Sequence, residues 1–384
     1  MPERQSLLII SFSEIVSDPR VRRQIALFRD AYEVITCGYG PAPEGVARHI
    51  ELPLTENASI WDGRVLALRQ YRLETWRNPG LAGAWRRLKG LRPDIVLANE
   101  AIAAPLALRL KPRRGTHVDL HEYHSRVREN EGYWRKRAKP WIEWMIRAYV
   151  AKAGSWTAVA PGIADEYERE FGFRPEVVRN TTPYAEQTPT AVTWPPRLVH
   201  SGAGMRKRGT ELIVRGVIAA ANGATLDLYL TKGDPGYLAE LSALAATSGG
   251  RVTLHDPVPY EQLVGVLNGY DVGIHVLPPV NFNHLMALPN KVFDYLQARL
   301  GVIVGPSPEM VALVEAAGYG VSTADFTPEA IAAAVDALTP AAVEDMKAAA
   351  HAAARTYASD AEDAVWKAAI DRIAARRIGG RHGR

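Results

Sequence analysis

Residues 285–308, LMALPNKVFDYLQARLGVIVGPSP, combine the start of an amphipathic helix with a short apolar strand. On a helical wheel that begins at Asn290, the apolar residues share one side: Val292, Phe293, Leu296 and Leu300. The polar side carries Asn290, Lys291 and Asp294. We expect the first face to pack against the protein and the second to bind a ligand.

The start of this helix has the features of an anion site. Pro289 lacks an amide hydrogen and suits a first helical turn, and the free N–H groups that follow it attract negative charge. Lys291 adds a positive charge there, while Asp294 offers an acceptor for paired hydroxyls such as those of a ribose. The alternative is an exposed Lys291–Asp294 pair on an ordinary surface helix, because such pairs are common at this spacing.

The run 301–305, GVIVG, predicts a strand buried on both faces of a parallel sheet. Similar apolar runs alternate with amphipathic ones along the chain. In the first half the expected strands are 7–12, 33–38, 95–99, 117–121, 157–160 and 176–179, with helices at 20–30, 61–76 and 134–153. In the second half they are 197–201, 225–230, 251–255, 272–277, 301–305 and 320–322, with helices including 211–220. This alternation is typical of doubly wound α/β domains.

Two such domains are expected from a chain of 384 residues. We place the first at residues 1–182, a Pro- and Thr-rich linker at 183–196 and the second at 197–355. Ligands bind outside the carboxyl ends of parallel strands, so we expect a cleft between the two domains where these ends face each other. A helix at 360–373 precedes a basic tail, residues 378–384, that we expect to be disordered.

Composition excludes several classes of protein. The single cysteine, Cys37, rules out an intrachain disulfide and leaves too few thiolates for a cysteine-based metal site, which fits a reducing cytoplasm. No run approaches the roughly 20 apolar residues of a membrane span. Residues 1–180 hold 29 Lys and Arg against 22 Asp and Glu, and the remainder holds 17 against 20. Nucleic acid is not expected, since no basic stripe with interleaved aromatics accompanies this asymmetry.

Polar residues follow the expected strands of the first domain. After the first strand come Ser13 and Asp18, where Asp18 and Pro19 predict a helix N-terminus with Arg20 close by. Later strands are followed by further polar residues: Glu100, His121, Glu122 and His124. All of these residues could contact an acceptor or a phosphate. For Asp18 and Arg20 the alternative is an ordinary capped helix with solvated arginines. Two imidazoles and a carboxylate make a weak metal site, and no D-x-D triplet is present.

The second domain opens with a glycine-containing basic loop, residues 200–210, HSGAGMRKRGT, between a strand and a helix. Gly202 and Gly204 would let the backbone approach a ligand, and Arg208 would neutralise a phosphate. The loop matches neither the Walker A nor the dinucleotide motif, so ATP hydrolysis and NAD chemistry are not first choices. A solvated basic turn is the alternative.

A basic, tryptophan-bearing segment, residues 133–152, has two interpretations. It could bind an anionic partner, either the inner face of a membrane or an anionic acceptor, or it could be a helix that covers the core with a solvated basic face. Pro140 is expected to break or restart this helix.

The order of these motifs resembles the GT-B glycosyltransferases, most closely the retaining family-4-like group, over nearly the whole chain. The similar stretches are SDPRVRRQ, HEY, VVRN, SGAGMRKRG and LPNKVFDYLQA. The resemblance implies an acceptor on the N-terminal domain, a nucleotide sugar on the C-terminal one, and a last helix, 356–377, that returns to the first domain. It also implies roles for single residues: Arg208 and Lys291 on the diphosphate, Asp294 on the ribose, and His121 at the donor sugar.

Two positions depart from the family pattern, and at one of them Asp294 stands where the family usually has a longer glutamate. Met286 stands where the first of two acids is expected, and Asn283, His284 or the amides around Ala287 and Leu288 could replace it. The expected function is transfer from a UDP- or GDP-type sugar to a hydroxyl acceptor, with retention and without metal or other cofactor. His121, Arg208 and Lys291 are the expected catalytic residues. The alternatives are a nucleotide-sugar epimerase or hydrolase, a pseudo-glycosyltransferase, or a catalytically silent sugar-nucleotide-binding partner.

Overall fold

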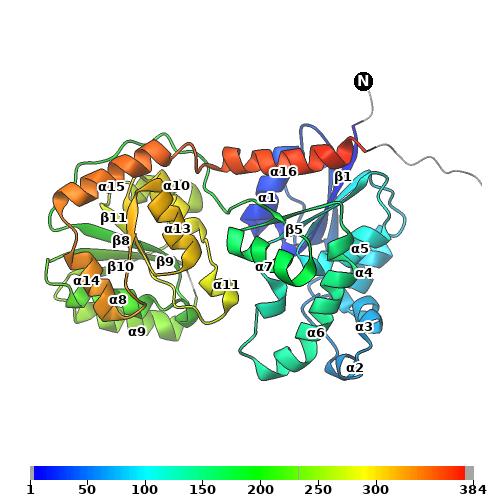
Figure 1. Ribbon diagram of the computed structural model, residues 1–384, viewed down its shortest axis with the longest axis horizontal. Coiled ribbons are helices and arrows are strands. Elements are labelled where there is room, and N and C mark those ends of the chain that lie inside the picture. Colours follow the sequence, from blue (N-terminus) through cyan, green and yellow to red (C-terminus); the bar gives the residue numbers. More distant parts are fainter. Residues whose placement is uncertain (1–3, 232, 377–384) are drawn as a thin grey trace, which may run out of the picture. The chain divides into compact units, whose positions relative to one another are not determined.

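The computed structural model, which describes residues 4–231 and 233–376, contains two α/β units (Figure 1). Unit 1 comprises Met1–Arg179 and Asp363–Arg384, and unit 2 comprises Asn180–Glu362. Each unit is built on one parallel sheet, of seven and six strands respectively. The expected α/β class with two doubly wound sheets is therefore confirmed. The basic tail at 378–384 lies outside the described residues.

The sheet of unit 1 has the strand order β3-β2-β1-β4-β5-β6-β7. Its strands are β1 (Ser6–Glu14), β2 (Glu33–Tyr39), β3 (Arg48–Leu52), β4 (Ile95–Asn99), β5 (Gly115–Leu120), β6 (Ser155–Ala158) and β7 (Glu176–Val177). β1 pairs in parallel with both β2 and β4, so the strand order reverses there. Such a switch point leaves a crevice at the carboxyl ends of the strands, which is where ligands bind in this type of sheet.

The helices of unit 1 pack on both faces of this sheet. They are α1 (Pro19–Phe28), α2 (Gly63–Ala67), α3 (Tyr71–Arg77), α4 (Pro79–Leu88), α5 (Ala104–Arg109), α6 (Gly132–Ala148) and α7 (Pro161–Phe171). The last helix, α16 (Ser359–Ala374), also contributes to this core. Its Trp366, Ile370 and Ile373 are fully buried in one cluster with residues of β1, α1 and β4.

Three local expectations for unit 1 are wrong. The edge strand β3 was not expected, because its sequence, RHIEL, is half polar. The single helix expected at 61–76 is two short helices, α2 and α3, separated where Arg69 adopts a φ of +54°. α6 continues through Pro140 without a break. The carbonyl that Pro140 cannot bond belongs to Lys136, whose side chain is exposed.

The sheet of unit 2 has the order β10-β9-β8-β11-β12-β13. Its strands are β8 (Arg197–Ala203), β9 (Thr225–Thr231), β10 (Val252–His255), β11 (Val272–His275), β12 (Gly301–Val304) and β13 (Gly320–Ser322). The four residues of β12 are buried between two parallel neighbours, as their apolar run predicts. The switch point lies between β8 and β11.

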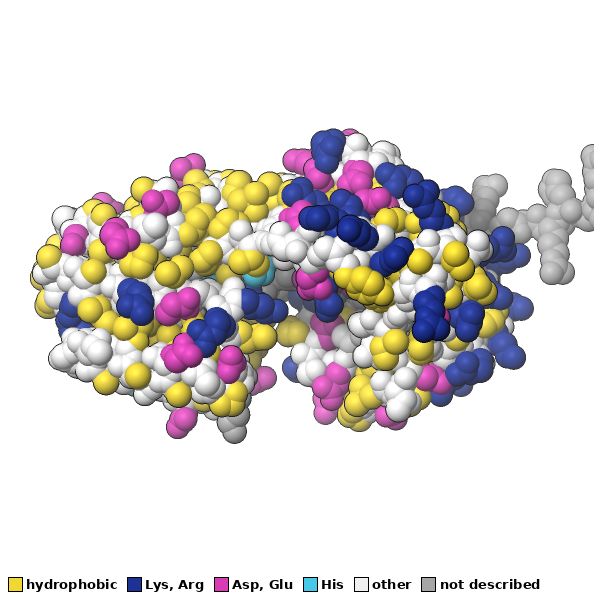
Figure 2. Space-filling model, turned by 90° about the horizontal axis from the view of Figure 1, so that it is seen from below, with side chains coloured by type: hydrophobic (Ala, Val, Ile, Leu, Met, Phe, Trp, Pro, Cys, Tyr) yellow, Lys and Arg dark blue, Asp and Glu magenta, His cyan; other side chains and the backbone are white. Residues whose placement is uncertain are grey.

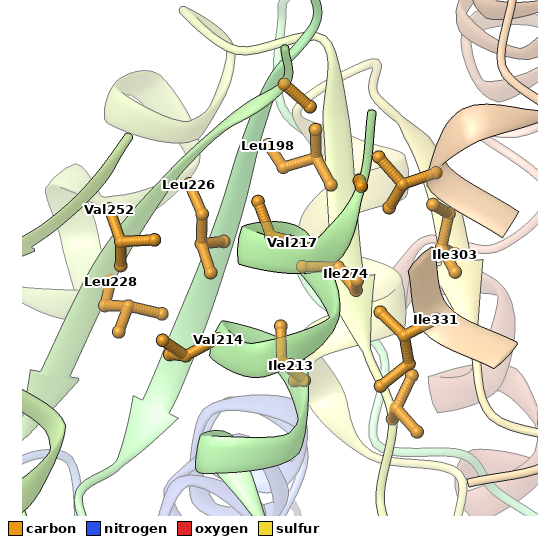
Figure 3. Close-up of a cluster of buried hydrophobic side chains, with 14 of the residues drawn as sticks. Leu198, Ile213, Val214, Val217, Leu226, Leu228, Val252, Ile274, Ile303 and Ile331 are labelled. Atoms are coloured by element: carbon orange, nitrogen blue, oxygen red, sulfur yellow. The ribbon is translucent and has the colours of Figure 1, made fainter. Parts of the chain in front are cut away.

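The helices of unit 2 are α8 (Thr210–Ala219), α9 (Pro235–Ala246), α10 (Tyr260–Leu267), α11 (Phe282–Leu285), α12 (Asn290–Gln297), α13 (Pro308–Ala317), α14 (Pro328–Asp336) and α15 (Pro340–Ala353). Figure 3 shows that Ile213, Val214 and Val217 of α8 pack against apolar side chains of the strands. Residues 183–196 form no helix or strand. They are held to unit 2 by hydrogen bonds such as Ala185 N to Gln297 Oε1 at 3.1 Å.

Candidate active site

The polar residues of unit 1 gather at the carboxyl ends of β1, β4 and β5, at the switch point of the sheet. They line a pocket of about 400 Å³. Of the residues expected here, the pocket wall contains Ser13, Asp18, Glu100, His121 and His124. The fold of unit 1 therefore brings together five of the seven site residues that were predicted for the first domain.

Glu100 is the centre of this cluster. It lies 3.0 Å from Nε2 of His124 and 3.4 Å from Nδ1 of His121. Its φ of +73° is rare for a residue with a side chain, and such strained backbone concentrates at functional sites. Burial raises the pKa of Glu100, but the charges of His124 and His121 outweigh burial, so the net pKa lies below the usual value. Glu100 is therefore ionised at neutral pH.

The two histidines respond in the opposite direction. Burial lowers the pKa of His124, but Glu100 overcomes this effect and raises the pKa to about 9. Burial also lowers the pKa of His121, and Glu100 and Asp119 raise it above the usual value. The cluster consequently combines a carboxylate with protonated imidazole, and its charges largely cancel.

Arg20 does not line the pocket, contrary to expectation. It is buried and makes a two-pronged ion pair with Asp119, with Nε to Oδ2 and Nη2 to Oδ1 both at 2.7 Å. Asp119 in turn lies 3.1 Å from Nε2 of His121. Arg20 thus positions His121 through Asp119 instead of contacting a ligand in the pocket. Burial raises the pKa of Asp119, but Arg20 more than reverses this and holds the pKa well below its usual range.

Two other expected residues of unit 1 have local roles. Asp18 caps α1, as its sequence predicts, because Oδ1 accepts from the N–H groups of Arg20 and Val21 at 3.1 and 3.2 Å. Ser13 Oγ donates to the other oxygen of Asp18 at 2.7 Å. Glu122 has an exposed side chain that is not part of the pocket wall, and its carbonyl accepts from Tyr167 OH at 2.9 Å.

In unit 2, the basic loop after β8 and the start of α12 come together, as predicted. A Cβ atom on Gly202 would lie only 2.8 Å from Cε of Lys291, so the glycine makes room for that side chain. Gly204 is explained by packing, since a Cβ there would meet Leu238 at 2.6 Å. Burial lowers the pKa of Lys291, Asp294 opposes this effect, and the nearby Arg208 lowers it further. Over residues 4–231 and 233–376 no ion pair is found for Lys291 or Arg208.

Two buried histidines lie close to these cations. His200 in β8 and His275 in β11 stack with ring centroids 5.8 Å apart and planes 3° from parallel. Burial lowers the pKa of His200 to about 4 and that of His275 well below its usual value, and Lys291 and Arg208 add to both shifts. Both rings are therefore neutral at pH 7. Sequence analysis missed His275, because one histidine at the end of an apolar strand gives no functional signal.

Asp294 is not on a free face of α12, and that expectation is wrong. It is 3% exposed, and Thr182 Oγ1 donates to its Oδ1 at 2.6 Å. Burial raises the pKa of Asp294 to about 6, although Thr182, Lys291 and Tyr260 all oppose the shift. The carboxylate that was expected to hold a ribose is thus packed inside unit 2 and bonded to a hydroxyl of the protein.

The remaining residues expected on the donor side lie in α11, in α12 and in the segment between them. Asn283 and His284 lie in α11, and Leu288 is buried just before α12 begins at Asn290. Burial lowers the pKa of His284, and Arg208 contributes to the shift. Met286 follows α11 and supplies no acid there. Arg208 and Lys291 therefore remain the charged groups best placed for an anionic ligand in unit 2.

Comparison with known proteins gives a family match for the first half of the chain. The model described as Glycosyltransferase Family 4 matches residues 26–182. No curated protein matches the sequence.

Solved structures match over almost the full length. Sucrose-phosphate synthase from Thermosynechococcus elongatus has a TM-score of 0.74 and 13% identity, with 97% of this chain and 100% of that chain covered. A glycosyltransferase from Rickettsia africae has a TM-score of 0.68 and 12% identity, covering 97% and 100%. Anabaena HepE in complex with UDP and glucose has a TM-score of 0.68 and 12% identity, covering 96% and 100%. At these identities the likeness shows the fold, which is GT-B.

Proposed function

We propose that this chain, a glycosyltransferase that resembles family 4 and has the GT-B fold, moves a sugar from a nucleoside-diphosphate sugar to a hydroxyl acceptor. The observation that carries the proposal is the pair of cations in unit 2, Arg208 and Lys291, which have no carboxylate partner among the described residues. Two neighbouring cations that lack a carboxylate within ion-pair distance favour an anion between them. The HepE structure contains UDP and glucose, which supports a UDP sugar as the donor. A GDP sugar is the alternative donor.

In the proposed reaction, Arg208 and Lys291 stabilise the charge that develops on the leaving diphosphate. The N-terminus of α12 carries free N–H groups, since Pro289 provides no side-chain cap, and these add to the same electrostatic effect. We propose retention of configuration, as the family resemblance implies, and no role for a metal ion. His121, oriented by Asp119 and Glu100, is proposed to contact the donor sugar.

The donor site is tested by titrating UDP and GDP into Lys291→Ala and Arg208→Ala. Each variant is expected to lose about 1–3 kcal/mol of nucleotide affinity, the cost of removing a charged hydrogen bond. Lys207→Ala is the matched control, because Lys207 belongs to the same loop but is exposed. Unchanged nucleotide affinity in both test variants would contradict the assignment of the donor site. Loss of sugar transfer in the presence of EDTA would contradict the metal-free mechanism.

We also propose that unit 1 touches a membrane surface peripherally on the cytoplasmic side. No helix within residues 4–231 and 233–376 has the length and hydropathy needed to cross a bilayer. The tryptophans expected to reach the membrane do not support this contact, since Trp134 and Trp141 are buried. The support comes from exposed apolar side chains around α2, α3 and the start of α6: Leu54, Ile60, Leu68, Leu73 and Tyr133. On the face shown in Figure 2, Lys and Arg side chains are denser over unit 1 than over unit 2.

Sedimentation with vesicles tests this contact. We expect binding to vesicles that contain anionic lipid, and loss of binding when Ile60 and Leu68 are both changed to Ser. A protein that stays in the supernatant with every vesicle would exclude the contact.

A further inference from the structure

The pocket of unit 1 has two chemically different ends. Its polar end is formed at the strand ends by Ser13, Asp18, Glu100, His121 and His124. The rest of its wall is mainly apolar, and much of it comes from one face of α6. The apolar side chains of this wall include Trp61, Ile102, Val127, Trp134, Ala138, Trp141, Ile142 and Met145, and Ser11, Ser59 and Arg128 are its polar members. At about 400 Å³ the pocket is large enough for a compound of drug-like size.

The charged groups at the polar end already have partners. Glu100 is paired with His124 and His121, and the oxygens of Asp18 accept from Ser13 and from backbone amides. Among the described residues that line the wall the one arginine is Arg128, whose guanidinium lies 3.9 Å from the carboxylate of Glu131. A phosphate or carboxylate would find no uncompensated cation here. A hydroxyl can donate to Glu100 or accept from a histidine without adding charge.

The apolar wall argues against a sugar as the group that fills the pocket. A sugar carries hydroxyls around its whole ring, and each one that loses water without gaining a partner costs free energy. Over the face formed by Ala138, Trp141, Ile142 and Met145, the only side chain with a hydrogen-bonding group is Trp141. Its indole N–H already donates to Thr75 Oγ1 at 2.9 Å. An apolar body would instead gain from burial on this face.

We propose that the pocket of unit 1 holds an acceptor with an apolar ring or chain against α6 and a single hydroxyl at Glu100 and His124. This inference rests on the proposed function and names the class of acceptor. In the transfer step, the acceptor oxygen bonds to the anomeric carbon of the sugar and the bond from that carbon to the diphosphate oxygen breaks. The hydroxyl proton passes to the departing diphosphate. Glu100, held in its strained conformation, orients the hydroxyl.

Direct binding without any donor tests the class of acceptor. The probes are umbelliferone, a phenol on a flat ring, and geraniol, an alcohol on a chain, with glucose and a glucose phosphate as polar counterparts. We expect saturable calorimetric binding of at least one apolar probe and none of either sugar. Binding of umbelliferone alone indicates a ring-bearing acceptor, and binding of geraniol alone indicates a lipid-like one. Binding of neither, or of a sugar in preference, overturns the proposal.

A variant of the wall locates the binding. Ile142→Glu places a carboxylate on the apolar face, and we expect it to weaken binding of the apolar probe by at least about tenfold. Ile142→Leu should retain the affinity. Lys136→Gln is the matched control, because it also lowers the net charge by one on α6 but lies at an exposed position. Equal affinity in Ile142→Glu and the unmodified protein, with both folded by calorimetry, overturns the placement.

Nucleotide titration separates the two proposals. If the apolar probe binds and UDP and GDP do not, the acceptor class stands and the proposed transferase function fails. If a nucleotide binds and no apolar probe does, the function stands and the acceptor class fails.

Discussion

The two polar clusters lie at equivalent places in their sheets but differ in how their charges are compensated. In unit 1, Glu100 faces His121 and His124, and Asp119 faces Arg20. In unit 2, Arg208 lowers the pKa of Lys291, and two neutral histidines lie close to both cations. A cluster whose charges form ion pairs suits a neutral hydroxyl, whereas cations without an ion-pair partner suit a diphosphate. The same architecture thus provides two different ligand environments.

The largest expected effect breaks the compensation in unit 1. Arg20→Gln leaves the buried carboxylate of Asp119 without its guanidinium partner, and removal of one member of a buried pair costs about 3–5 kcal/mol of unfolding free energy. Urea unfolding measures this loss. The double variant Arg20→Gln with Asp119→Asn should recover part of the stability, because the uncompensated charge is gone. A loss below about 1 kcal/mol in the single variant would show that the pair does not support unit 1.

A smaller effect is expected from Asp294 in unit 2, and it depends on pH. Its pKa is raised to about 6 in the folded protein, so folding takes up a proton between the unfolded pKa of about 3.9 and pH 6. The associated stability is fully present below about pH 3.9 and is lost as the pH rises through 6, by about 3 kcal/mol.

Asp294→Asn serves as the comparison for this pH dependence. The variant lacks the titrating group, so the difference in melting temperature between it and the unmodified protein should change between pH 5 and pH 7.5 in favour of the variant. Saturating nucleotide should not abolish this trend if Asp294 remains bonded to Thr182. A difference in melting temperature that stays constant from pH 5 to pH 7.5 would mean that burial does not raise the pKa of Asp294.

The smallest effect concerns Arg206, which belongs to the same basic loop as Arg208. Its guanidinium makes two hydrogen bonds with Glu240, at 2.8 and 2.6 Å, on the surface. Because its charge is already compensated, Arg206→Ala should leave nucleotide affinity unchanged, in contrast to Arg208→Ala. Isothermal titration of both variants under one set of conditions makes the comparison. Equal losses would show that the loop acts through its total charge alone.

Local patterns predicted the parts of the fold that depend on neighbours in sequence. The apolar run at 301–304 predicted a buried parallel strand, and Asp18 with Pro19 predicted a capped helix. The strand ends then brought Glu100, His121 and His124 together, because parallel strands end at the same edge.

The errors concern contacts that the sequence does not encode locally. Arg20 and Asp119 are 99 positions apart, and the sequence around either residue does not predict that they form an ion pair. The helical wheel predicted that Asp294 is exposed, because it lies opposite the apolar face of α12. Surrounding elements nevertheless bury every residue from Val292 to Gln297. Tertiary packing covers both sides of this short helix, so its period carries little information about exposure.

The burial of Trp366 in unit 1 also affects the order in which the protein can fold during synthesis. The chain begins unit 1, makes all of unit 2, and only then supplies Trp366, Ile370 and Ile373 to the core around β1 and α1. Domains usually fold as they emerge from the ribosome, the N-terminal one first. The core of unit 1 is therefore completed only after unit 2 has been made, and its apolar surface around Leu7 and Ile25 lacks the cover of α16 until then.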